Sequence, residues 1–289
     1  MARTPVIQLK KVVKKFFLGN DELTILKGVD MEVFAGEYVI LFGPSGSGKS
    51  TILNTIAGLE PTTTGDVVIR GENIAKFSSK ELAKYRRSKI GIVFQQFNLV
   101  KSFKVWENVA FPLINDGVTY NRRHDRALML LGLFGLAKMV NRRPTELSGG
   151  QQQRVAMARA LASNAWILIA DEPTGNLDSK SANDVMMVFR LLNKKSHRTI
   201  IMVTHNPDYL KEADKVYYIK DGLIEKVEVN SHPPEFAGDV KGVGELSDIK
   251  TLTFSDKDDE NEIKKKKKAD GVIETREPDI VDKTKSETK

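Results

Sequence analysis

The stretch that decides the fold is GPSGSGKST at residues 43–51, which follows directly on the apolar run YVILF at 38–42. It matches the phosphate-loop pattern G-x-x-x-x-G-K-[ST] in full, in the expected order of strand, loop and helix. Glycines let backbone N–H groups turn toward phosphate oxygens, Lys49 adds a cation, and Ser50 can ligate Mg²⁺. A flexible Gly/Ser linker would lack the strand before it and the helix-forming residues after it. We therefore predict nucleotide binding.

The whole chain sets limits on the class of protein. It has 289 residues, a net charge of +7 and no cysteine, which excludes disulfides and thiolate metal sites. No run of eighteen apolar residues occurs, and residues 1–5 lack the apolar segment of a signal peptide. We expect a cytosolic protein whose membrane association needs a partner.

The composition changes at about residue 226. Residues 227–289 hold 12 Lys+Arg and 16 Asp+Glu, including five lysines at 264–268, which leaves a net charge of +11 on residues 1–226. The excess of basic residues suits a nucleotide-binding domain that faces acidic lipid or another polyanion. It is equally consistent with a charge that only keeps the domain soluble. Apolar residues thin out after 226, so we predict a domain at 1–226 and a low-complexity, disordered tail at 227–289.

Periodicity places the elements around the loop. Alternation and the turns at Gly19 and Gly36 predict strands within residues 6–42, and a capping box at 78–81 predicts a helix to about residue 88. Residues 90–94 read as the next strand, and residues 105–162 read as mostly helical. The wholly apolar runs at 166–170 and 199–203 predict central strands covered on both faces. Residues 216–222 predict a late hairpin.

Four further motifs accompany the loop. LSGGQ at 147–151 opens a helical stretch, with Ser148 as its N-cap and two glycines that allow an anion to approach the backbone. ILIADE at 167–172 is an apolar strand that ends in two carboxylates, of which Asp171 suits Mg²⁺ and Glu172 suits a general base. Gln95 and His205 each follow a strand. Alone, Ser148 would read as an ordinary cap and His205 as an ordinary loop residue.

In this order the motifs resemble the ATP-binding cassette (ABC) ATPases over residues 6–226. The resemblance implies an α/β P-loop fold with three parts. These are a RecA-like mixed-sheet catalytic lobe, an antiparallel β subdomain, and a helical signature lobe inserted at about 97–162. It implies ATP as substrate, Mg²⁺ as cofactor and ATP hydrolysis as the activity.

The resemblance also assigns roles to single residues. Phe16 would stack on adenine, where most members carry tyrosine, and Phe17 is its rival. Glu172 would be the general base, His205 would steady the γ-phosphate, and Gln95 would contact the metal and the attacking water. The expected Mg²⁺ ligands are Ser50, Gln95 and Asp171. The other expected nucleotide-binding residues are Gly43, Pro44, Ser45, Gly46, Ser47, Gly48, Lys49, Thr51, Ser148, Gly149, Gly150, Gln151 and, at the subunit contact, Asp178.

In this family the two anion sites lie on separate lobes, so Ser148 and Gly150 would complete the site of a second copy, head to tail. The string DEPTGNLDS at 171–179 resembles the branch of lipoprotein-release, macrolide-export and cell-division ATPases. We therefore expect a homodimer on the cytoplasmic side of the membrane, bound to a separate permease, with no nucleic-acid partner. The permease would dock near Gln96 to Pro112, on some of the apolar residues Phe97, Leu99, Val100, Phe103 and Trp106; two or three of these would be core instead.

Two questions stay open at this point. The sequence does not separate export or extraction from signalling across the membrane. A soluble ABC ATPase that acts on DNA, ribosomes or a cofactor-assembly scaffold is the alternative. Against it, only 99 residues separate Lys49 from Ser148, which leaves no room for a coiled-coil insertion, and the chain holds one cassette.

Overall fold

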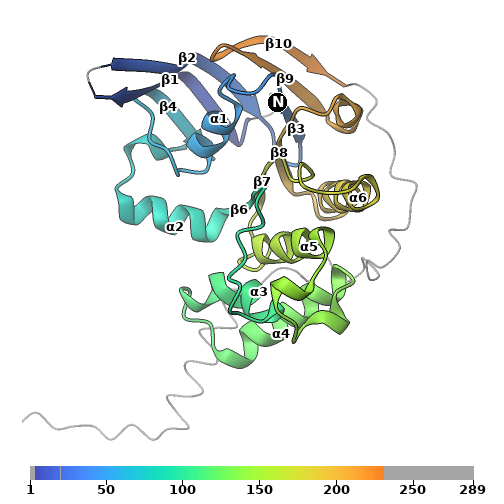
Figure 1. The fold of residues 1–289 in the computed structure, drawn as a ribbon. Helices are drawn as coiled ribbons and strands as arrows, with labels where there is room; N and C mark the ends of the chain where they lie inside the picture. Colours follow the sequence, from blue (N-terminus) through green and yellow to red (C-terminus); the bar gives the residue numbers. More distant parts are fainter. Residues whose placement is uncertain (1–3, 20, 231–289) are drawn as a thin grey trace, which may run out of the picture. The chain divides into compact units, whose positions relative to one another are not determined.

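The computed structural model describes residues 4–19 and 21–230 (Figure 1). The predicted tail therefore lies almost entirely outside the described residues. The last described strand, β10 (Leu223–Val229), continues past residue 226.

A six-stranded sheet carries the phosphate loop. Its strand order is β10-β9-β3-β8-β7-β6, and every neighbouring pair is parallel except β9 and β10, which form the predicted hairpin. The other bounds are β3 (Tyr38–Phe42), β6 (Ile90–Val93), β7 (Ile167–Asp171), β8 (Thr199–Thr204) and β9 (Lys215–Lys220). The phosphate loop, Glu172 and His205 follow β3, β7 and β8, so the parallel arrangement brings them to one edge of the sheet.

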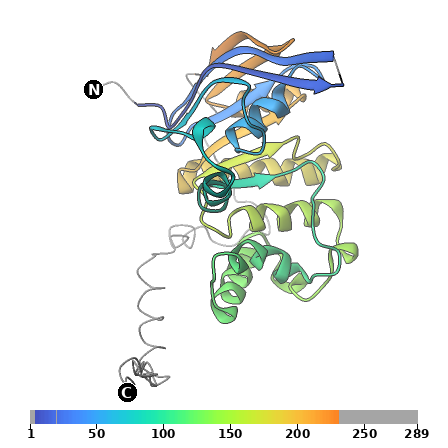
Figure 2. The same ribbon diagram turned by 90° about the vertical axis from the view of Figure 1, so that its left-hand side faces the viewer.

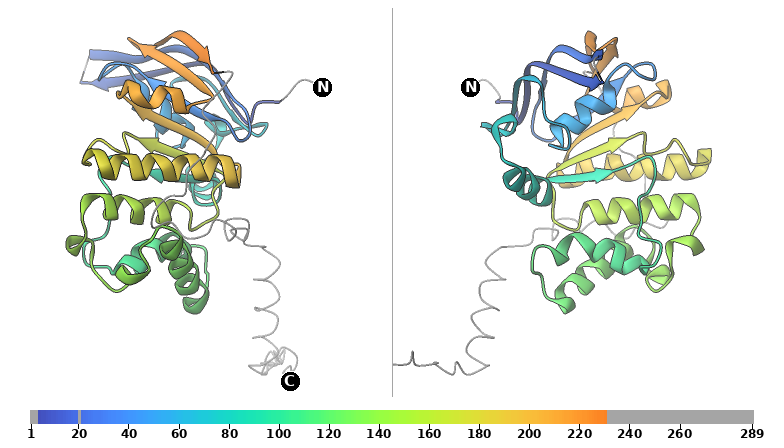
Figure 3. Two further views of the ribbon diagram at one scale, coloured as in Figure 1. Left: turned by 90° about the vertical axis from the view of Figure 1, so that its right-hand side faces the viewer. Right: turned by 60° about the vertical axis from the view of Figure 1, so that its left-hand side comes forward.

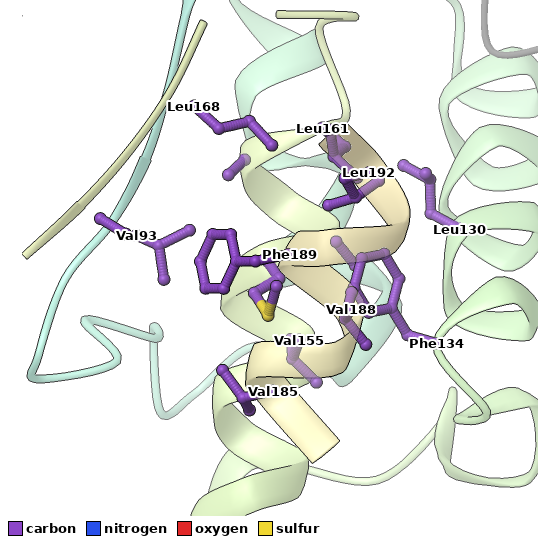
Figure 4. Packing of buried hydrophobic residues seen from close by; sticks show 14 of the residues in the cluster. Val93, Leu130, Phe134, Val155, Leu161, Leu168, Val185, Val188, Phe189 and Leu192 are labelled. Atoms are coloured by element: carbon purple, nitrogen blue, oxygen red, sulfur yellow. The ribbon is translucent and has the colours of Figure 1, made fainter. Parts of the chain in front are cut away.

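Both faces of this sheet are covered, which explains its wholly apolar strands. On β3, Tyr38 and Ile40 belong to one hydrophobic cluster, whereas Val39 and Leu41 belong to a second. The first cluster lies against the helices, and Figure 4 shows Phe189 of α6 (Ser179–Ser196) packed near Val93 and Val155. The prediction of central strands covered on both faces is confirmed for β7 and β8.

A second, four-stranded sheet covers the other face. Its order is β2-β1-β4-β5, all antiparallel, and it contains β1 (Ile7–Leu18), β2 (Asp21–Val33), β4 (Thr64–Ile69) and β5 (Glu72–Asn73). Between the sheets lies α1 (Lys49–Ile56), whose Ile52, Leu53 and Ile56 are buried in the second cluster (Figure 2). A short turn of helix, η1 (Ile74–Lys76), leads to α2 (Ser79–Lys89), which begins at the predicted capping box of Ser78 and Glu81.

The helical lobe lies below α6 in the views of Figure 3. It contains α3 (Val105–Ile114), α4 (Tyr120–Leu133), the turns η2 (Ala137–Met139) and η3 (Pro144–Glu146), and α5 (Gly149–Ala160). A last turn, η4 (Pro207–Glu212), joins β8 to β9. None of the helices in the described ranges combines the length and apolar character that a bilayer span requires.

Candidate active site

Backbone hydrogen bonds hold the phosphate loop in place. Ser47 N–H donates to Pro44 O over 3.3 Å, and Gly222 N–H, from the β9–β10 turn, donates to Ser47 O over 3.1 Å. A Cβ on Gly43 would lie 2.1 Å from Ile219 O, and a Cβ on Gly48, where φ is +101°, would lie 2.9 Å from Leu26 Cδ2. Glycine is therefore required at 43 by the close approach of β9 and at 48 by the backbone conformation as well.

The loop presents several hydrogen-bond donors to an anion. The N-cap of α1, Gly48, supplies no side-chain hydrogen bond, and no acidic residue lies in the first turn, so the first N–H groups of the helix have no carboxylate. Ser47 Oγ is buried and has no hydrogen-bond partner within residues 4–19 and 21–230. Lys49 is only 5% exposed, and its Nζ donates to Pro44 O over 2.6 Å. These features fit a polyphosphate, because it would accept from all three kinds of donor.

The electrostatics of the loop agree with that fit. Burial lowers the pKa of Lys49, and the nearby carboxylates of Glu172 and Asp171 raise it in part. Burial has the opposite effect on the acid Asp171, whose pKa it raises. The hydrogen bond from Ser50 lowers the pKa of Asp171, and the charge of Glu172 raises it. Two carboxylates beside one buried ammonium leave the acids only partly neutralised, which suits a site that receives a further cation.

Ser50 and Asp171 are brought together from segments 121 residues apart. Ser50 Oγ donates to Asp171 Oδ1 over 3.1 Å. Hydroxyl and carboxylate oxygens are ligands that Mg²⁺ prefers, so this pair is chemically suited to the metal. Gln95 as the third ligand stays a prediction.

Glu172 and His205 form a pair at the ends of β7 and β8. His205 Nδ1 lies 3.1 Å from Glu172 Oε1, and Glu172 N–H donates to Val203 O over 3.0 Å. The backbone of Glu172 has φ of +44°, a left-handed conformation that costs a non-glycine residue about 1–3 kcal/mol. Such strain is common at functional sites.

Gln95 packs against the loop at 173–178. A Cβ on Gly175 would lie 2.9 Å from Gln95 Nε2, and Asn176 Nδ2 donates to Gln95 O over 3.1 Å. At the end of this loop Asp178 caps α6: its carboxylate accepts from Ser181 N–H over 3.0 Å and from Ser181 Oγ over 2.7 Å. The same Ser181 hydroxyl and backbone bonds lower the pKa of Asp178.

The LSGGQ motif begins α5 as predicted. Ser148 Oγ accepts from Gln151 N–H over 3.4 Å, and Gln151 Oε1 accepts from Ser148 N–H over 3.0 Å, which forms a capping box. Gly150 is needed for packing, because a Cβ there would lie 2.7 Å from Ser181 Oγ on α6. Gly149 lies next to Leu177 and Phe97. Figure 1 shows α5 with the helical lobe, whereas α1 lies with the sheets.

The two aromatic candidates for adenine stacking differ in environment. Phe16 is half-buried, and the Lys14 ammonium lies 4.6 Å from its ring centroid; Lys14 also contacts Glu60, 3.0 Å away, and Pro61 O. One face of the Phe16 ring is therefore occupied, and an adenine would have to stack on the other. Phe17 is 68% exposed. Adenine stacking by Phe16 stays a prediction.

The surface beside the predicted docking segment is hollowed, and the docking site itself stays a prediction. A hollow of about 750 Å³ is lined by Phe111, Pro112 and Asn98 of the segment at 96–112, together with Arg86 and Arg87 of α2. None of the five predicted apolar anchors lines it. Trp106 is 8% exposed and belongs to the core of the helical lobe, because its ring packs edge-on against Tyr120 and His124.

One polar residue of the site escaped sequence reasoning. Gln153 on α5 is fully buried and contacts the segments that carry Gln95 and Glu172. A signal was present, because Gln153 precedes Ala156 and Met157 by three and four residues and so lies on the buried face of the helix.

The family model described as "ABC transporter" matches residues 26–175. An ABC transporter ATP-binding protein of Thermotoga maritima is 46% identical over 77% of this chain and 95% of its own length. The macrolide export ATP-binding/permease protein of Psychrobacter arcticus is 43% identical over 76% of this chain, which spans 33% of that longer protein. Two solved structures of the cassette MJ0796 cover 77% of the chain with a TM-score of 0.72.

One MJ0796 structure, 42% identical to this chain, is a dimer in a post-hydrolysis state bound to ADP and Pi. The predicted cassette fold, with its catalytic lobe, antiparallel subdomain and helical lobe, is confirmed by these neighbours. The chain therefore belongs to the ABC transporter family, in which it is an ATP-binding, ATP-hydrolysing subunit.

Proposed function

We propose that this chain works as a head-to-tail homodimer that closes around two ATP molecules and transmits the closure to a separate membrane permease. The observation that carries the proposal is the convergence of Lys49, the Ser50–Asp171 pair and the Glu172–His205 pair at one edge of one sheet. The dimeric state of MJ0796 supports the homodimer. The combined ATP-binding/permease name of the Psychrobacter relative supports the permease.

In the proposed mechanism Lys49, Ser47 and the first N–H groups of α1 bind the phosphates. Glu172 Oε1 contacts His205, which leaves the other carboxylate oxygen available to take a proton from water. Ser50, Asp171 and Gln95 would hold Mg²⁺, which would neutralise charge on the phosphates. Ser148 of the partner subunit would approach the γ-phosphate from the opposite side.

The permease would dock at the groove beside α2 and α3. Phe111 is 42% exposed and Ile114 is 45% exposed, so large apolar surface is available near the hollow. Apolar anchors of this kind dominate the energetics of many interfaces. Docking there would place the chain on the cytoplasmic side of the membrane. The segment from Gln95 to Phe111 would link the docked partner to the active site.

Co-purification and ATPase assays test the proposal together. The full chain should hydrolyse ATP, and Lys49→Ala should remove the activity because the phosphates lose a buried cation. Phe111→Glu should keep basal hydrolysis yet lose co-purification with an integral membrane protein from detergent extracts. Leu223→Glu is the matched control, since Leu223 is 46% exposed on β10, away from the groove.

Three results would contradict the proposal. The phosphate site is wrong if Lys49→Ala hydrolyses ATP at the parental rate. The docking surface is wrong if Phe111→Glu assembles as well as Leu223→Glu. If the parental chain recovers no membrane protein and DNA or ribosomes stimulate its ATPase, the soluble alternative replaces the permease-coupled function.

A further inference from the structure

A buried amide joins three parts of the site. Gln153 lies on α5, four residues after the start of that helix, and its side chain has no exposed surface. Its Nε2 donates a hydrogen bond to Pro173 O over 2.7 Å. It also donates a second, longer hydrogen bond to Phe94 O over 3.5 Å. Pro173 directly follows Glu172, and Phe94 directly precedes Gln95.

The orientation of this amide is determined by its neighbours. Backbone carbonyls only accept hydrogen bonds, so the NH₂ group of Gln153, with its two donors, must face Pro173 and Phe94. The opposite orientation would place Oε1 against two carbonyl oxygens. Oε1 is buried and has no hydrogen-bond partner among the residues that the structure describes.

A second amide ties the same two loops. Asn176, three residues beyond Pro173, donates to Gln95 O over 3.1 Å. Gln153 thus holds the loops from inside and Asn176 holds them from the surface. Because β6 and β7 are parallel neighbours, both loops leave the sheet at the same edge, and the two amides set their separation there.

Stability alone does not account for a glutamine at position 153. A buried amide with an unmet acceptor is a poor core residue, and apolar residues of similar size often replace buried polar groups at little cost. What an apolar residue cannot do is fix the distance between two carbonyls and the helix that begins at Ser148.

We propose that Gln153 is a positioning residue, which fixes the positions of Gln95 and Glu172 relative to each other and to α5. The inference rests on the proposed function of Glu172 and Gln95 in ATP hydrolysis. Through Gln153, a shift of the segment after Gln95 changes the placement of Glu172 and of Ser148 at the head of α5. Because the side chain is fully buried and its amide contacts the backbone beside Glu172 and Gln95, it acts through these two residues, and we expect it to change turnover more than ground-state ATP binding.

The test is the kinetics of Gln153→Met in the full chain. Methionine keeps the length and helix propensity and removes both donors. The kcat should fall roughly tenfold to a hundredfold, as for a misplaced catalytic group. The KM and the affinity for a fluorescent ATP analogue should change by less than about twofold. Gln153→Asn, which keeps the amide and shortens it by one methylene, should behave similarly and serves if the methionine variant folds poorly.

Asn193→Leu is the matched control. Asn193 is 2% exposed, and its amide also bridges two carbonyls, donating to Gly36 O over 2.8 Å and to Arg198 O over 3.0 Å. It lies at the far end of α6 from Asp178. Its loss should lower the thermal unfolding temperature about as much as Gln153→Met does, with kcat unchanged per folded molecule.

The outcomes separate the two proposals. If the parental chain does not hydrolyse ATP, the proposed function fails and the inference fails with it. If the parental chain is active, the inference alone is overturned by a kcat within about twofold of the parent in Gln153→Met or Gln153→Asn. It is also overturned if Asn193→Leu loses the same activity, because the effect would then belong to any buried amide.

Discussion

Replacing Glu172 by glutamine tests the proposed general base with the least disturbance of the structure. Glutamine has the shape of glutamate, and its amide oxygen can take the place of Glu172 Oε1 at 3.1 Å from His205 Nδ1. The bond from Glu172 N–H to Val203 O belongs to the backbone and is unaffected. The variant therefore keeps the loop and loses only the ability to accept a proton from water.

The size of the effect follows from that single loss. A positioned general base contributes about 10²- to 10⁴-fold to a rate. This factor corresponds to roughly 3–5 kcal/mol in the activation free energy, at 1.36 kcal/mol per factor of ten. ATP binding should be unchanged, because Lys49, Ser47 and the amide groups of α1 are intact. If hydrolysis resets the dimer, the variant should also accumulate as a dimer with ATP and Mg²⁺.

Phosphate release measures kcat, titration with a fluorescent ATP analogue measures affinity, and light scattering measures the dimer. His205→Ala is the companion variant, since it removes the partner of Glu172 and leaves the carboxylate. A kcat within about tenfold of the parent in Glu172→Gln would refute the assignment, as a base contributes at least about a hundredfold. A monomer at saturating ATP and Mg²⁺ would count against the composite site.

Three further substitutions test the adenine contact and the packing of the phosphate loop. Phe16→Ala should raise the KM for ATP more than it lowers kcat, because a stacking surface acts on ground-state binding; the same result for Phe17→Ala alone would place the adenine one residue along β1. Gly43→Ala should unfold at lower temperature, since its Cβ would lie 2.1 Å from Ile219 O. A cost of about 1–3 kcal/mol, at roughly 2–4 °C per kcal/mol, should be visible by calorimetry. An unchanged unfolding temperature would contradict the steric argument.

The sequence was sufficient for several elements that depend on local order, although it did not reveal the short hairpin of β4 and β5. The loop at 43–51, the alternation before it and the capping box at Ser78 each involve residues close in the chain, so periodicity and motif spacing predicted their elements. The central position of β7 and β8 was also predictable, because strands buried on both faces lose the polar alternation.

The motifs predicted which chemical groups the site contains, and only the tertiary structure decided which of them meet. Ser50 contacts Asp171 from 121 residues away, and Glu172 contacts His205 from 33 residues away. Gln95 contacts the loop at 175–176, up to 81 residues further along the chain, and its predicted place at the metal stays a prediction.

The docking segment shows the same division. The sequence identified 96–112 as rich in apolar residues, but it did not determine which of them face outward. Trp106 is core because Tyr120 and His124 of α4 pack on it, whereas Phe111 lines the hollow next to α2. Which face of a short apolar segment is buried depends on helices that lie elsewhere in the chain. Gln153 was overlooked for the same reason, because the two carbonyl groups that its amide contacts lie 20 and 59 residues away in the chain.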